Sequence, residues 1–167
     1  MSRSLQFKAA LASLALLVIV APAAARQSLG IFGEWGAFRD PAAPRCYAIA
    51  KAAPSNLARD YDPYATIGTW PRRKVRGQVH FRLSRQLQPD RPITLIIGGQ
   101  RFGLSGGGGD AWAKDRAMDA AIVAAMRSAG QMTVSATDTS GRRFSNTYNL
   151  VGAATAMDAA TVSCART

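Results

Sequence analysis

Short stretches in which apolar and polar residues alternate recur along most of this 167-residue chain. The clearest one spans Lys74–Ser84, where Val75, Val79, Phe81 and Leu83 share one parity and the residues of the other parity are polar or charged. Alternation with a period of two is typical of a strand that turns one face toward the core. We therefore predict a β-strand here, with those four side chains buried.

Similar patterns, bounded by turn residues, predict further strands and two helices. The other predicted strands are Ile31–Phe38, Cys46–Ala50, Ala65–Trp70, Ile93–Ile97, Arg101–Leu104, Gln131–Thr137 and Arg143–Val151. The alanine-dense segment Ala117–Ala129 predicts a helix with Asp110 or Asp115 as its N-cap, and Ala153–Val162 predicts a short second helix. We expect a mainly β fold, an antiparallel sandwich or partly closed barrel with one or two short helices against it.

The first 25 residues have the layout of a secretory signal peptide. Arg3 and Lys8 precede the apolar run Ala9–Val20, and alanines at 23–25 offer a cleavage site. A membrane anchor is the alternative, but spanning a bilayer takes about 20 apolar residues, more than this run contains. We expect residues 1–25 to be removed, leaving a single β-rich domain over 26–167. The protein is predicted to be periplasmic or secreted and not integral to a membrane.

Both cysteines, Cys46 and Cys164, lie within 26–167. In an oxidising compartment an isolated pair is most simply a disulfide, which here would close nearly the whole domain. Two buried thiols or one reactive cysteine are the alternatives. Neither cysteine lies in a C-x-x-C motif or beside the single histidine, so we predict the disulfide.

The order of several short blocks resembles a known family. The blocks are Phe32-Gly33-Glu34-Trp35, Cys46-Tyr47-Ala48, the helix Met118–Ala129, the strand pair Met132–Leu150, and a closing L-x-G-x-x-x-A at Leu150, Gly152 and Ala156. This order resembles the invasion-associated locus B family of exported bacterial proteins, over about residues 32–165. The resemblance implies a small β-rich fold, a periplasmic or surface location, and association with the envelope or with host cells, without catalytic residues. Family members often carry a second cysteine pair just before the central helix, where this chain has Gly106–Asp110.

The residues that could support catalysis or bind a metal do not form a convincing set. Ser105 matches the letters of G-x-S-x-G, but His80 precedes it and falls on the solvent-facing parity, where we expect nothing to orient it. One histidine and two cysteines cannot form a usual four-ligand zinc site or an iron–sulfur cluster. Asp60 and Asp62 lack the spacing of a calcium loop and predict a turn. We predict that the protein is not an enzyme and needs no cofactor.

Positive charge is the remaining signal. Without residues 1–25 the chain has 19 basic and 10 acidic residues, a net charge of +9. A candidate anion-binding set lies on or beside the predicted strand: Arg72, Arg73, Lys74, Arg76 and Arg82. Outward cations in a row attract phosphates or sulfates, but they also form a solvated face that keeps an edge strand from pairing. Anionic lipid or glycan would be the partner, and no motif for nucleic acid is present.

The three tryptophans leave a further choice between core filling and a platform for a sugar or peptide. Two tryptophans exposed side by side would be needed to support the platform.

Three functional hypotheses follow from the sequence. The first is a non-enzymatic interaction protein of the envelope or surface, whose partner the sequence does not identify. A polyanion-binding module is the second, and a small serine hydrolase is the third.

Overall fold

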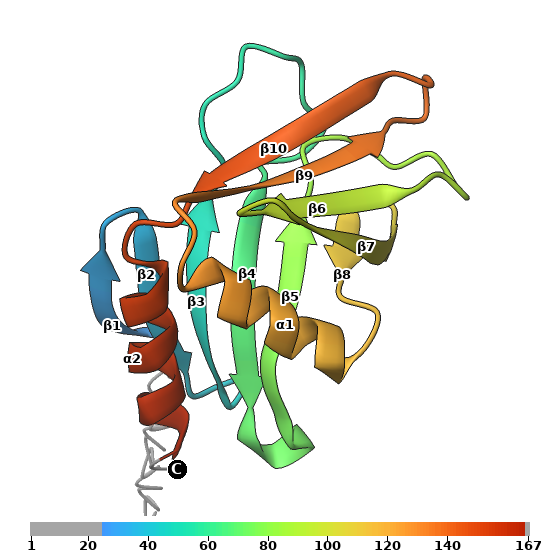
Figure 1. Ribbon diagram of the computed structural model, residues 1–167. Coiled ribbons are helices and arrows are strands. Elements are labelled where there is room, and N and C mark those ends of the chain that lie inside the picture. Colours follow the sequence, from blue (N-terminus) through green and yellow to red (C-terminus); the bar gives the residue numbers. More distant parts are fainter. Residues whose placement is uncertain (1–24, 166–167) are drawn as a thin grey trace, which may run out of the picture.

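The computed structural model describes residues 25–165, so the predicted signal peptide lies almost entirely outside the described residues. The chain is mostly β, as predicted, with two helices (Figure 1). In chain order the elements are β1 (Gln27–Phe32), β2 (Trp35–Asp40), β3 (Arg45–Lys51), β4 (Tyr64–Trp70), the 3-10 turn η1 (Pro71–Arg73), β5 (Val75–Arg82), β6 (Ile93–Ile97), β7 (Gln100–Gly107), β8 (Asp110–Trp112), α1 (Arg116–Met126), β9 (Gln131–Thr137), β10 (Arg143–Asn149) and α2 (Ala153–Ala165).

All ten strands form one antiparallel sheet in the order β1-β2-β3-β4-β5-β8-β7-β6-β9-β10. The sheet does not close. Instead it bends, so that β6, β7, β9 and β10 cross the upper ends of β3, β4 and β5 (Figure 1). The rings of Phe81 on β5 and Tyr148 on β10 meet inside this bend, with 5.7 Å between their centroids. The result is a partly open sandwich whose core lies between the two halves of the sheet.

Both helices pack on the inner side of the sheet, α2 against β1 to β4 and α1 against β5, β6 and β7 (Figure 1). The N-cap of α1 is Asp115, one of the two residues predicted for this position. Its side chain accepts a hydrogen bond from the backbone N–H of Met118. Alanines form much of the buried face of α2, which lets this helix lie close to the sheet. Near its end, Cys164 is bonded to Cys46 of β3, and the predicted disulfide is confirmed.

The predicted strand Ile31–Phe38 is wrong, because the segment is a hairpin. β1 ends at Phe32, β2 begins at Trp35, and these two residues pair across the two-residue turn of Gly33 and Glu34. Gly33 has a φ of +58°, a conformation that turns of this kind require. The apolar residues on both sides of the turn made the two strands look continuous.

The predicted strand around Phe81 is β5, but a bulge interrupts its alternation. Val79, Phe81 and Leu83 are fully buried as predicted, whereas Val75 is only half-buried and lies outside the core. The register between β4 and β5 shifts near Gly77, whose φ is +64°, and the extra residue moves Val75 to the other face. β5 lies between β4 and β8, but β8 pairs only with His80, Phe81 and Arg82, so the part of β5 that carries Arg76 pairs with β4 alone.

Candidate binding groove on the outer face

A row of paired residues crosses the outer face of the sheet, the face turned away from α1 and α2. Thr66 of β4 pairs with His80 of β5, and His80 pairs with Trp112 of β8. Residues directly opposite each other in antiparallel strands share one face. Their chain neighbours Phe81 and Ala111 are fully buried on the inner side, so the row faces outward.

This row is part of a hollow of about 500 Å³ on β3, β4, β5 and β8, which we call the aromatic groove. Its lining contains Tyr47, Tyr64, Trp70 and Trp112 together with Arg26, Arg45, Ile49, Thr66, Gly68, Gln78 and His80. The ring of Trp70 lies over Gly68, where a Cβ would meet it at 2.5 Å. Trp112 is 38% exposed, so a large apolar ring is accessible from solvent. An apolar hollow with a few fixed polar groups is typical of a ligand-binding site.

A hydrogen-bonded network fixes His80 in this groove. Its Nε2 lies 2.9 Å from Oδ1 of Asp110, and Nδ1 lies 3.4 Å from the hydroxyl of Thr66. The guanidinium of Arg82 donates to the other oxygen of Asp110 at 2.9 Å and stacks on Tyr61 at 4.7 Å. The expectation that nothing orients His80 is therefore wrong. Asp110 was considered as a helix cap, whereas it lies on the three-residue strand β8.

The groove brings a hydroxyl, a histidine and a carboxylate together, those of Thr66, His80 and Asp110. Ser105 pairs with Trp112, so it lies one strand beyond Trp112 and roughly 10 Å from His80. Thr66 is closer, yet it lies within β4, whose backbone groups are paired with β3 and β5. The paired backbone N–H groups of β4 are therefore not free to donate to a bound ligand. The network suits hydrogen bonding to a ligand.

Of the five candidate anion-binding residues, Lys74, Arg76 and Arg82 were expected to point outward in one row along the strand, and the structure separates them. Arg72 and Arg73 are exposed on the turn η1, and Arg82 belongs to the network of the aromatic groove. Lys74 and Arg76 line a different hollow, of about 180 Å³, beside the last turn of α2. The bulge near Gly77 causes this separation, because it changes which face the preceding residues occupy.

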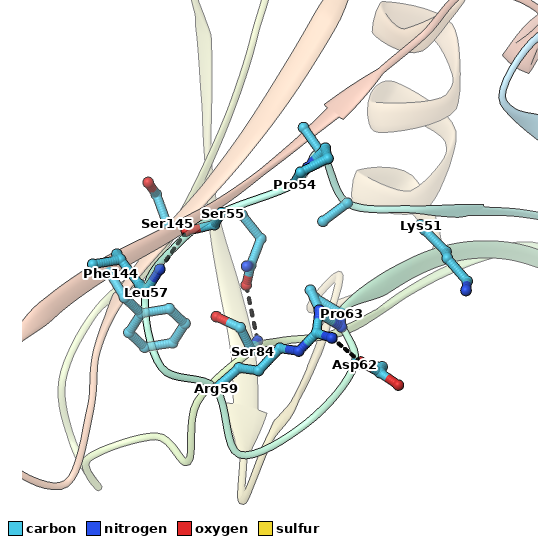
Figure 2. A pocket seen from close by; sticks show the side chains of 13 residues that line it. Lys51, Pro54, Ser55, Leu57, Arg59, Asp62, Pro63, Ser84, Phe144 and Ser145 are labelled. Atoms are coloured by element: carbon cyan, nitrogen blue, oxygen red, sulfur yellow. Dashed lines mark hydrogen bonds and ion pairs between the residues drawn. The ribbon is translucent and has the colours of Figure 1, made fainter.

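A small hollow of about 90 Å³ lies under the loop between β3 and β4 (Figure 2). The loop is held by a hydrogen bond from the backbone N–H of Ala53 to the carbonyl of Thr147 on β10. Arg59 and Asp62 form an exposed ion pair at its rim, and Asn146 accepts a hydrogen bond from the backbone N–H of Ser84 below it (Figure 2). Pockets for small molecules usually measure about 300–1,000 Å³, so this hollow is too small for such a ligand.

Asp60 and Asp62, which were weighed as calcium ligands, are engaged separately. Asp60 accepts a hydrogen bond from the backbone N–H of Gln86, while Asp62 pairs with Arg59. Within residues 25–165 there is no group of three or more histidine, cysteine or acidic side chains that could hold a metal ion.

Comparison of the chain with models of protein families, with curated proteins and with solved structures found no match. Neither helix of the described part of the chain is long and apolar enough to cross a membrane. The disulfide is compatible with an exported protein.

Proposed function

We propose that the protein is an exported, non-enzymatic interaction protein of the bacterial cell envelope or surface, as its resemblance to invasion-associated locus B proteins implies. We further propose that its ligand is a saccharide chain held in the aromatic groove. The disulfide between Cys46 and Cys164 supports the location, because such bonds persist in oxidising compartments.

Trp70 and Trp112 do not lie side by side, so the simple platform considered from the sequence is not formed. The assignment of the ligand rests instead on two indole rings that line one groove. Trp112 lies two strand spacings from Thr66, and Trp70 lies four residues along β4 from Thr66. Their backbone positions are thus roughly 16 Å apart, at two ends of the same groove. The ring of Trp70 lies over Gly68, so the two indoles are closer together than their backbones, and both line one elongated groove, which favours an extended ligand.

The polar groups between the tryptophans fit the hydroxyls of a sugar. The apolar face of a sugar ring packs on an indole or phenol ring, while its hydroxyls need partners that both donate and accept. Thr66 and Gln78 supply such groups between the aromatic rings, while His80, whose ring nitrogens contact Asp110 and Thr66, positions the Thr66 hydroxyl. Arg82 and Asp110 bind each other, so their charges largely cancel near the groove.

Co-sedimentation with purified bacterial cell-wall polysaccharide tests the proposal. We expect the oxidised protein to sediment with the polymer, and Trp112→Ala to lose most of this binding. Leu57→Ala is the matched control, because Leu57 is also an exposed apolar side chain, at 67%, and lies outside the groove. The saccharide assignment fails if Trp112→Ala sediments like the wild type, or if the wild type does not sediment.

A further inference from the structure

A second hollow lies on the outer face of the other half of the sheet, formed by β6, β7, β9 and β10. It measures about 540 Å³. Its floor contains short hydroxyl side chains, Thr94 of β6 with Ser135 and Thr137 of β9, and Thr94 pairs directly with Ser135. Their neighbours Leu95 and Val134 are fully buried on the inner side of the sheet.

Basic side chains from separate segments surround this floor. Arg101 lies on β7, Arg143 lies on β10, and Arg91 precedes β6. The ammonium nitrogen of Lys114 approaches the same face, 3.6 Å from where a Cβ would stand on Gly103. We call these three arginines, Lys114 and the hydroxyl floor the arginine face.

The positive charge of the arginine face is not neutralised. Among the described residues, no ion pair includes Arg91, Arg101, Arg143 or Lys114, and no carboxylate lines the hollow. In the aromatic groove, by contrast, the arginines have carboxylate partners: Arg26 and Arg45 share Asp40, and the neighbouring Arg82 is bound to Asp110.

Asp138, which follows β9 next to this hollow, is already engaged. It is buried, accepts hydrogen bonds from the backbone N–H groups of Arg142 and Ser140, and pairs with the guanidinium of Arg85. These contacts hold the pKa of Asp138 below its usual range, and the hydrogen bond from the backbone N–H of Arg142 has the largest effect. Asp138 therefore stays ionised but is committed to partners other than Arg143.

We propose that the arginine face binds a sulfated or phosphorylated polysaccharide. Guanidinium groups bind sulfate and phosphate oxygens through paired N–H donors, and the threonine and serine hydroxyls can complete the contacts. Arg101 and Arg143 lie three strand spacings apart across the sheet, and their registers differ by four residues, so their backbones are roughly 20 Å apart. At this separation the two side chains can contact different anions, which fits a polymer that carries repeated anions.

The composition of the face favours a polysaccharide over a membrane surface. Proteins that lie on bilayers usually insert apolar side chains beside their cations. The large apolar side chains that are exposed in residues 25–165 are Ile31, Leu57, Trp112, Val151 and Val162. None of them lines the arginine face.

Binding of fluorescently labelled heparin, a sulfated polysaccharide, tests this proposal. We expect the wild type to bind at about 50 mM salt, and Arg101→Gln/Arg143→Gln to bind about tenfold more weakly with a shallower salt dependence. Lys51→Gln/Arg116→Gln is the control, because both residues are exposed like Arg101 and Arg143, lie outside the arginine face, and give the same loss of charge. This control should bind within about twofold of the wild type. Thermal unfolding of each variant verifies that it is folded.

Three results would overturn the proposal. Equal weakening of both double variants would mean that heparin responds only to net charge. Absence of wild-type binding to heparin would exclude the ligand class. Loss of binding to anionic phosphatidylglycerol vesicles, but not to heparin, in Arg101→Gln/Arg143→Gln would assign the face to a membrane. The proposal is independent of the aromatic groove, and Trp112→Ala should retain heparin binding whatever the outcome of the cell-wall experiment.

Discussion

At the scale of single residues, Gly152 decides how closely the start of α2 approaches the turn between β1 and β2. A Cβ on Gly152 would collide with the carbonyl oxygen of Phe32, and the φ of Gly152 is +86°. In the same place Trp35 donates its indole N–H to the carbonyl of Asn149 at 2.8 Å. The turn at 32–35 and the segment at 149–152 thus meet in the fold.

We expect Gly152→Ala to lower the free energy of unfolding by about 2–3 kcal/mol, because it adds both backbone strain and a collision. Gly108→Ala is the control. Its φ of +60° brings similar strain, but a Cβ there would meet no atom within 4 Å, so its cost should be about 1 kcal/mol. Urea denaturation measures both. Equal losses would show that the close contact at Gly152 does not matter for stability.

At the scale of elements, the register of β5 determines which side chains reach the core and which reach the aromatic groove. We expect Phe81→Ala to cost about 3–5 kcal/mol, since Phe81 is fully buried against Tyr148. Gln78→Ala should change stability by no more than about 0.5 kcal/mol, because Gln78 is on the outer face. Similar costs for the two variants, measured by chemical denaturation, would mean that the register is different.

Local patterns predicted most of the elements but not their irregularities. Alternation identified β5, yet the bulge near Gly77 could not be located, because glycine fits a regular strand as well as a bulge. β8 was missed because three residues are too few to show a period. Lys74, Arg76 and Arg82 do not form the predicted row, because the bulge near Gly77 could not be located from the sequence.

The aromatic groove could be predicted even less, because its residues meet only through long-range pairing. Tyr47, Trp70, His80 and Trp112 come from four strands, and the position of β8 beside β5 brings Trp112 to His80. The sequence identified the tryptophans as candidates for a platform, but the partners of His80 depend on the strand order. The arginine face depends on strand order in the same way.

At the scale of the whole molecule, the disulfide joins the third strand to the last helix and closes a loop of 118 residues. In the chain-entropy model such a loop contributes roughly 4–5 kcal/mol. We expect Cys46→Ala/Cys164→Ala to lower the free energy of unfolding by about 2–5 kcal/mol, as measured by urea denaturation of the oxidised wild type and the variant. An unchanged midpoint and slope would show that α2 is held by packing alone.

The claim that the aromatic groove holds a saccharide is tested most directly by nuclear magnetic resonance of the three indole N–H groups. Trp→Phe variants assign the three signals, and a soluble cell-wall oligosaccharide is then added to the oxidised protein. We predict that the signals of Trp70 and Trp112 shift with one common binding curve. The signal of Trp35 should stay in place, because this side chain is fully buried and bonded to the carbonyl of Asn149. Unchanged signals of Trp70 and Trp112 at a high excess of the oligosaccharide would contradict the account.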